Sequence, residues 1–162
     1  MKLLNKLNDL GQIVIDLSAI KINYKIIKKK IGKKSNIAAV LKSDAYGLGI
    51  NHIAQTLQEI GCKQFFVATI NEGIKLRRLI KKSDILVLNG ITNQSSTSLK
   101  KIINFKLLPV LNSYQEIKQW IEYSKNLNNI HPVALHFDSG MNRLGISMSE
   151  LNNVKNLISF NK

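Results

Sequence analysis

The chain has 162 residues, 44% of them hydrophobic, which is enough for a buried core but too few for a closed eight-unit (β/α) barrel of about 250 residues. Its net charge of +14 comes almost entirely from lysine, without a zinc-finger spacing or an aromatic platform, so we expect no specific nucleic-acid partner. No apolar run approaches the roughly 20 residues of a membrane span, and the N-terminus lacks a signal peptide, so we expect a cytoplasmic protein without a membrane partner.

Short apolar runs alternate along the chain with longer segments of helical periodicity. The runs predict strands at 12–16, 37–41, 65–67, 85–88, 107–110 and 132–138. The intervening patterns predict helices at 18–31, 51–60, 70–80, 95–103, 114–127 and 148–158. Near-continuous apolar strands that alternate with helices are typical of a parallel α/β sheet. We therefore expect an α/β fold with an entry strand and helix followed by about five βα units, which amounts to an incomplete (β/α) barrel.

Residues at the predicted helix starts support this assignment. Ser18 is placed to cap the first helix, and Lys28–Lys30 fall at its end, where lysines complement the helix dipole. Three segments fit the capping box, in which a hydroxyl and a carboxylate satisfy backbone donors reciprocally: Thr69–Glu72, Ser113–Glu116 and Ser147–Glu150. The polar stretch 93–98 predicts a short loop before a helix, not a linker, so we expect one domain over 1–162. The single cysteine, Cys62, is expected to be a small buried residue.

Lys42 lies where the predicted strand 37–41 ends and a turn containing Gly47 and Gly49 begins. In a (β/α) barrel this edge of the sheet carries the active site. Burial disfavours the charged ammonium form, so a lysine here is suited to act as a base or as an imine-forming nucleophile. The alternative is a lysine whose stem lies along the strand end while its amine reaches water, since buried lysines are rare.

The residues that follow Lys42 decide between these possibilities. The segment resembles the cofactor-lysine segment of alanine racemases, and it reads Lys42-Ser43-Asp44-Ala45-Tyr46-Gly47-Leu48-Gly49. In that family the lysine binds pyridoxal phosphate (PLP) covalently and is the base on one face of the substrate, while the tyrosine contacts the cofactor phosphate. The resemblance therefore implies PLP as the cofactor, Lys42 as the catalytic and cofactor-binding residue, and Tyr46 as a phosphate contact. Tyr46 lies near the predicted start of a helix, where phosphate is favoured.

A second segment, much further along the chain, resembles another part of the same family: His136-Phe137-Asp138-Ser139-Gly140-Met141-Asn142-Arg143-Leu144-Gly145. The resemblance implies that Arg143 binds the substrate carboxylate, a role that suits a planar bidentate donor. The alternative is an ordinary surface pair with Asp138. We expect Asp138 to order the loop and Met141 to pack. Many family members have a lysine, carbamylated in some, where His136 stands, so the support of Arg143 must differ here.

The resemblance implies an isomerase: the N-terminal portion of an alanine racemase, which interconverts L- and D-alanine for peptidoglycan. By the same resemblance, the C-terminal domain is absent and the full-length family forms homodimers. The family's second base is a tyrosine from the partner subunit's C-terminal domain. Apart from Tyr46, the tyrosines of this chain are Tyr24, Tyr114 and Tyr123, and all three fall in predicted helices.

Two alternative functions remain open. One is a PLP-binding barrel protein without racemase activity. The segment 138–143 argues against this alternative, because it resembles alanine racemases. The other is an inactive truncated or split gene product, which the missing C-terminal domain favours. A metal-dependent function is not expected, because His52 and His131 lack metal-ligand spacing to acidic or cysteine partners.

Overall fold

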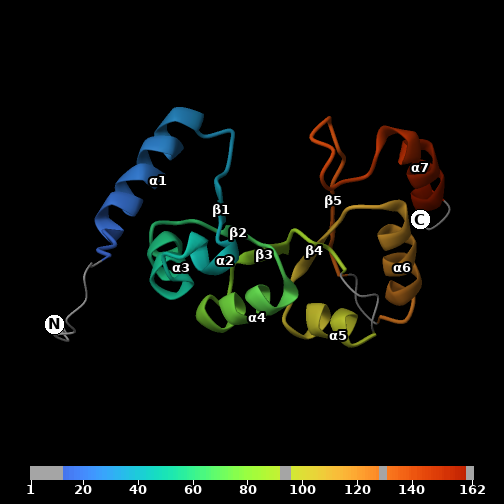
Figure 1. Ribbon diagram of the computed structural model, residues 1–162, viewed down its shortest axis with the longest axis horizontal. Coiled ribbons are helices and arrows are strands. Elements are labelled where there is room, and N and C mark those ends of the chain that lie inside the picture. Colours follow the sequence, from blue (N-terminus) through green and yellow to red (C-terminus); the bar gives the residue numbers. More distant parts are fainter. Residues whose placement is uncertain (1–12, 92–95, 128–130, 160–162) are drawn as a thin grey trace.

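The computed structural model describes residues 13–91, 96–127 and 131–159. Five parallel strands form a sheet in sequence order: β1 (Ala38–Val40), β2 (Gln64–Val67), β3 (Asp84–Val87), β4 (Leu108–Leu111) and β5 (Ala134–Leu135). The helices are α1 (Leu17–Ile31), α2 (Lys42–Tyr46), α3 (Ile50–Glu59), α4 (Ile70–Leu79), α5 (Ser96–Asn104), α6 (Tyr114–Ser124) and α7 (Leu151–Ser159), with a 3-10 turn, η1 (Met148–Glu150), before α7. Figure 1 shows α1 and α7 at opposite ends of this arrangement. The predicted α/β fold is confirmed.

The two faces of the sheet are buried to different extents. Side chains alternate along a strand, so residues paired in register share a face. The fully buried row packs into the helix-covered core and contains Phe65, Val67, Ile85 and Val87. The row on the other face is only partly buried or exposed, and it contains Val40, Phe66, Leu86 and Leu108. Helices α3, α4 and α5 lie along one side of the strands (Figure 1), so the second row is on the side that a closed barrel would turn inward.

The first predicted strand is wrong. Of the segment 12–16, Gln12 lies outside the described residues, and 13–16 belong to no strand. Helix α1 begins after Asp16, whose carboxylate oxygen Oδ1 accepts hydrogen bonds from the backbone N–H groups of Ser18 at 2.8 Å and Ala19 at 3.2 Å. The cap is therefore Asp16 and not Ser18, because an aspartate two residues earlier reaches the same unpaired donors.

The remaining predicted elements agree with the structure to within a few residues, and the last strand differs most. The segment 132–138 forms only the short β5, followed by an isolated bridge between Phe137 and Ile146. Pro132 has no N–H to give to a ladder, and beyond Phe137 the chain leaves the sheet in a loop that returns at Ile146. Within the predicted loop 93–98, residues 93–95 lie outside the described residues and helix α5 begins at Ser96.

Two of the three predicted capping boxes are complete. Thr69 and Glu72 exchange both bonds, and so do Ser147 and Glu150. At α6, the Ser113 hydroxyl accepts from the Glu116 N–H, but the Glu116 carboxylate binds the N–H of Asn112 instead of Ser113. The third box is therefore half formed, because the carboxylate reaches one residue further back.

Two further expectations concern single positions. Cys62 is fully buried, as expected, and burial raises the pKa of its thiol. Lys28–Lys30 form the last turn of α1, also as expected. Within the described part of the chain, no helix combines the length and apolar character needed to cross a bilayer.

Candidate active site at the carboxyl edge of the sheet

Lys42 lies at the carboxyl end of β1. The preceding residue, Leu41, is buried and still donates its N–H to the carbonyl of Phe66 on β2 at 2.7 Å. Lys42 is partly buried and faces a cavity of about 450 Å³. The other lining residues come from the loops after β2, β3 and β5: Ala68, Leu88, Asn89, His136, Phe137, Asp138, Ser139, Met141, Arg143 and Leu144. In parallel α/β folds this edge is where ligands bind.

The segment that carries Lys42 is a left-handed helical turn. Ser43, Asp44, Ala45 and Tyr46 all have φ between 53° and 57°. For residues with a side chain this conformation costs roughly 1–2 kcal/mol each. Such a run persists only where surrounding bonds fix it. Gly47, at φ 82°, ends the turn with an N–H bond to the carbonyl of Ser43 at 2.9 Å.

Asp44 joins this turn to two helices. Its Oδ1 accepts the N–H of Ile50 at the start of α3, at 3.1 Å, and the ammonium of Lys75 on α4, at 3.0 Å. The Lys75 bond, followed by the Ile50 bond, holds the pKa of Asp44 below its ordinary value. The buried side chain of Ala45 attaches the middle of the turn to the core.

Tyr46 closes the left-handed turn and does not begin a helix. It lies near a helix start, as expected, since α3 begins four residues later at Ile50. Its side chain is 62% exposed, and the Lys42 ammonium lies 5.9 Å from the centre of its ring. That distance is within the range of a cation–π contact. The turn therefore brings Lys42 and Tyr46 together.

Asp138 organises the loop that follows β5, as expected from the sequence. Its Oδ1 accepts the N–H groups of Gly140 and Met141, both at 2.9 Å, and its Oδ2 accepts that of Asn142, also at 2.9 Å. These bonds, that of Gly140 first, hold the pKa of Asp138 below its ordinary value. The expectation that Met141 packs is wrong: the residue is 76% exposed, and it lines the open cavity that Lys42 faces.

Arg143 is exposed and lines the same cavity as Lys42. The ion pairs among the described residues are Lys21–Glu59, Lys75–Asp44 and Lys125–Glu122. The alternative expectation, a surface ion pair between Arg143 and Asp138, is therefore not met among these residues. Two segments far apart in the sequence thus deliver a lysine and an arginine to one cavity.

Asn112, which the sequence motifs do not identify, fixes the orientation of His136. Its side-chain nitrogen donates to the carbonyls of Leu88 at 2.9 Å and Val110 at 2.8 Å, so its Oδ1 faces Nδ1 of His136 at 2.8 Å. An oxygen partner requires the proton on Nδ1, which leaves Nε2 of a neutral His136 as an acceptor. The available signal for this role was an asparagine two residues after the end of the predicted strand 107–110.

The family model described as "Alanine racemase, N-terminal domain" matches residues 15–162. The chain belongs to the alanine racemase family. Both motif-bearing segments and the cavity they share fall inside the matched residues. The family identified from Lys42 and Arg143 is therefore confirmed over nearly the whole chain.

Curated alanine racemases align with most of this chain. A catabolic alanine racemase of Agrobacterium fabrum is 43% identical over 142 residues, covering 87% of this chain and 36% of that protein. An alanine racemase of Rickettsia canadensis is 39% identical over 145 residues, covering 89% of this chain and 40% of that protein. The chain thus spans about two fifths of the length of these alanine racemases.

Solved alanine racemases share the fold. The crystal structure of alanine racemase from Bartonella henselae with covalently bound pyridoxal phosphate is 32% identical, with a TM-score of 0.82 over 90% of this chain and 42% of that one. An alanine racemase from Corynebacterium glutamicum is 27% identical, with a TM-score of 0.74 over 86% of this chain. The sheet and helices of this chain therefore have the arrangement of an alanine racemase barrel, of which they form a part.

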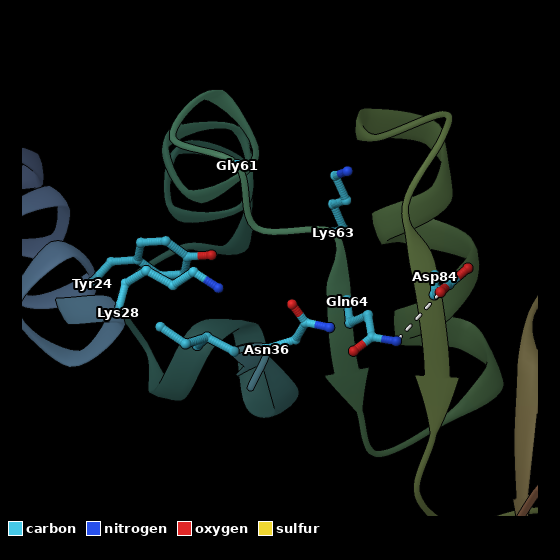
Figure 2. A pocket seen from close by; sticks show the side chains of 8 residues that line it. Tyr24, Lys28, Asn36, Gly61, Lys63, Gln64 and Asp84 are labelled. Atoms are coloured by element: carbon cyan, nitrogen blue, oxygen red, sulfur yellow. Dashed lines mark hydrogen bonds between the residues drawn. The ribbon is translucent and has the colours of Figure 1, made fainter. Parts of the chain in front are cut away.

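A second cleft, of about 390 Å³, lies at the opposite edge of the sheet (Figure 2). Tyr24 and Lys28 extend from α1 toward Asn36 and Gln64. Asn36 lies just before β1, and Gln64 is the first residue of β2. Several of its polar side chains already have partners: the Lys28 ammonium donates to the Ser35 carbonyl at 3.1 Å, and the Gln64 amide donates to Asp84 at 3.5 Å. Neither alanine racemase motif contributes a residue to it, so the Lys42 cavity is the candidate site. Among the described residues, no cluster of His, Cys, Asp and Glu side chains could hold a metal ion.

Proposed function

We propose that this chain is the N-terminal, PLP-binding portion of an alanine racemase, the enzyme that interconverts L- and D-alanine for peptidoglycan. The observation that carries the proposal is the convergence of Lys42 and Arg143, from two separate family segments, on one cavity at the carboxyl edge of the sheet. The proposal includes alanine as the substrate, one partial barrel domain over 1–162, a homodimer for the longer form and a cytoplasmic location.

The residues at the cavity fit PLP. The cavity volume of about 450 Å³ lies within the usual range of cofactor sites. Lys42 is partly buried, its amine lies 5.9 Å from the centre of the Tyr46 ring, and the guanidinium of Arg143 supplies a cation. When bound, PLP supplies an electron sink that weakens the Cα–H bond of an amino acid.

Each proposed residue has a distinct task. Lys42 attaches the cofactor through its amine and holds or removes the substrate Cα proton on one face. The Tyr46 hydroxyl donates a hydrogen bond to the cofactor phosphate. Arg143 binds the substrate carboxylate through its planar guanidinium, which offers two parallel donors. Asp138 supports that role by fixing the loop on which Arg143 lies.

Racemisation also needs a base on the opposite face of the substrate. Tyr24 lies in α1, Tyr114 and Tyr123 lie in α6, and none of the three lines the Lys42 cavity. In the family, the partner subunit's C-terminal domain supplies this base. Loss of one general base costs about two to four orders of magnitude in rate. We therefore expect the isolated chain to bind PLP without racemising alanine at a useful rate.

A chimera tests the function directly. Residues 15–162 of this chain would replace the matching segment of the Agrobacterium fabrum relative, and D-alanine formed from L-alanine would be measured by a coupled assay with PLP present. We expect racemisation that drops at least about 100-fold in the Lys42→Ala chimera, because the base and the cofactor attachment are both lost.

The Lys28→Ala chimera is the matched control, since Lys28 lies at the opposite edge of the sheet and should be replaceable. A chimera that folds and binds PLP through Lys42 yet does not racemise would contradict the proposal. That outcome would favour the PLP-binding protein without racemase activity.

A further inference from the structure

One glutamate side chain bridges two neighbouring loops at the candidate active site. Oε1 of Glu72 accepts the backbone N–H of Ser43 at 2.8 Å, in the loop after β1. Its Oε2 accepts the N–H groups of Ala68 at 2.7 Å and Thr69 at 3.1 Å, in the loop after β2. In a capping box, the glutamate carboxylate needs to accept only the N–H of the N-cap residue, here Thr69. The bond to Ser43 therefore adds a contact outside the helix that Glu72 caps.

The Ser43 bond falls at a strained position. Ser43 follows Lys42 directly and is the first of the four consecutive left-handed residues. A bond from its N–H to a carboxylate is charge-assisted and stronger than one to a neutral acceptor. The other side chain bonded to the turn's surroundings is Asp44, and backbone bonds join the Ala45 N–H to the Leu41 carbonyl at 3.0 Å and the Gly47 N–H to the Ser43 carbonyl at 2.9 Å. Glu72 is therefore the side chain that fixes the backbone next to the proposed reactive amine.

The same device recurs at two other helix starts. Glu116 of α6 accepts the N–H groups of Asn112, after β4, and Ile91, after β3. Glu150 accepts the N–H groups of Ser147, after β5, and Tyr114, after β4. Each carboxylate thus bridges its own loop and the preceding one. This recurrence indicates a consistent way of ordering the carboxyl edge, and Glu72 is its member beside Lys42.

We propose that Glu72 is a positioning residue: through the N–H of Ser43 it holds the left-handed turn in the conformation that presents Lys42 to the PLP aldehyde. The role of Lys42 in this statement rests on the proposed function. The bridge itself does not, because it consists of hydrogen bonds that form without a cofactor.

The variants separate this role from simple helix capping. Glu72→Asp keeps the charge at the start of α4 but shortens the side chain by one methylene, so it should no longer reach Ser43. Glu72→Gln keeps the length but turns an NH₂ group toward a backbone donor. Thr69→Ala is the matched control, because it removes the hydroxyl bond to the Glu72 N–H at 3.3 Å and leaves the Ser43 bond intact.

The first measurement uses the chain without PLP. Amide hydrogen exchange, followed by NMR on ¹⁵N-labelled protein, should show Ser43 protection falling about tenfold or more in Glu72→Asp and Glu72→Gln. In Thr69→Ala, Ser43 protection should change only as much as the global stability does. Ser43 protection that is unchanged in both Glu72 variants would overturn the proposal.

The second measurement follows PLP addition and borohydride trapping over time. The rate of labelling at Lys42 should fall about tenfold in the Glu72 variants, in step with the loss of Ser43 protection. Labelling at Lys28–Lys30 on α1 should stay constant and serves as the internal reference. Lost Ser43 protection with an unchanged Lys42 rate would overturn the positioning role. If wild-type Lys42 takes no label, the proposed function fails, while the exchange data still decide whether the bridge exists.

Discussion

At the scale of single residues, Asp138 shows how one carboxylate can order the loop that follows β5. Its two oxygens accept the N–H groups of Gly140, Met141 and Asn142. Every one of these bonds favours the ionised form, and the pKa of Asp138 is accordingly lowered. Protonation of Asp138 therefore weakens the loop that carries Arg143.

The lowered pKa gives a stability prediction with a definite sign. A carboxyl whose pKa is depressed on folding contributes stability above its unfolded pKa, near 3.8 for Asp138, and loses it as the pH falls through the folded value. We therefore expect the urea midpoint of the wild-type chain to fall more steeply than that of Asp138→Asn below that pH. Asp84→Asn serves as the exposed control. Parallel curves for wild type and Asp138→Asn would contradict this reading.

The sequence could predict that residues of two short, contiguous motifs lie at one cavity, although their roles there stay predictions. Lys42 and Arg143 are both found at the cavity that such motifs imply. It could not predict the role of Asn112, because this role depends on the Leu88 carbonyl and the His136 ring, which come from the loops after β3 and β5. Nor could it predict the left-handed turn, since nothing in Ser43–Tyr46 except Asp44 favours a positive φ.

At the scale of elements, Gly90, in the described segment directly after β3, is packed against the start of α6. Gly90, at φ 60°, lies beneath the carboxylate of Glu116. A Cβ at this position would come within 2.5 Å of Glu116 Oε2 and 2.7 Å of the Val110 carbonyl oxygen. The side chain can shift, but the backbone carbonyl belongs to the centre of β4. The bridge made by Glu116 therefore requires a glycine here.

A comparison of two glycine substitutions tests this packing. Gly90→Ala should lower the free energy of unfolding by more than Gly47→Ala, which pays only the left-handed backbone cost of roughly 1–2 kcal/mol. Gly47 lies in the left-handed region, at φ 82° and ψ 0°, and has no atom within 4 Å of an added Cβ, so it is a matched control. Urea denaturation measures both. Equal losses in the two variants would show that Gly90 is not packed as described.

Local signals explain which elements the sequence predicts well. Short apolar runs and hydroxyl–glutamate pairs locate β2, β3, α4 and α6 closely, because burial and capping act within a few residues. The segment 12–16 misleads, because an apolar run forms a strand only if a neighbouring strand pairs with it. The segment 132–138 is shortened because its pairing partners are set by the position of β4, which the local pattern does not contain.

At the scale of the whole molecule, five parallel strands present one row of side chains to the helices and leave the opposite row less covered. The described residues correspond to part of an alanine racemase barrel, over about two fifths of the relatives' length. Within that part, Lys42 and Arg143 line one cavity, and the ring of Tyr46 lies beside Lys42 without lining that cavity. The lysine-rich surface remains, by our prediction, without a specific nucleic-acid partner.

The central claim is that Lys42 binds PLP, and one measurement addresses it most directly. The chain would be mixed with PLP, reduced with borohydride, digested and mapped by mass spectrometry. We predict that the label lies mainly on Lys42 and is lost in Lys42→Ala. Label distributed over other lysines and unchanged in Lys42→Ala would contradict the account.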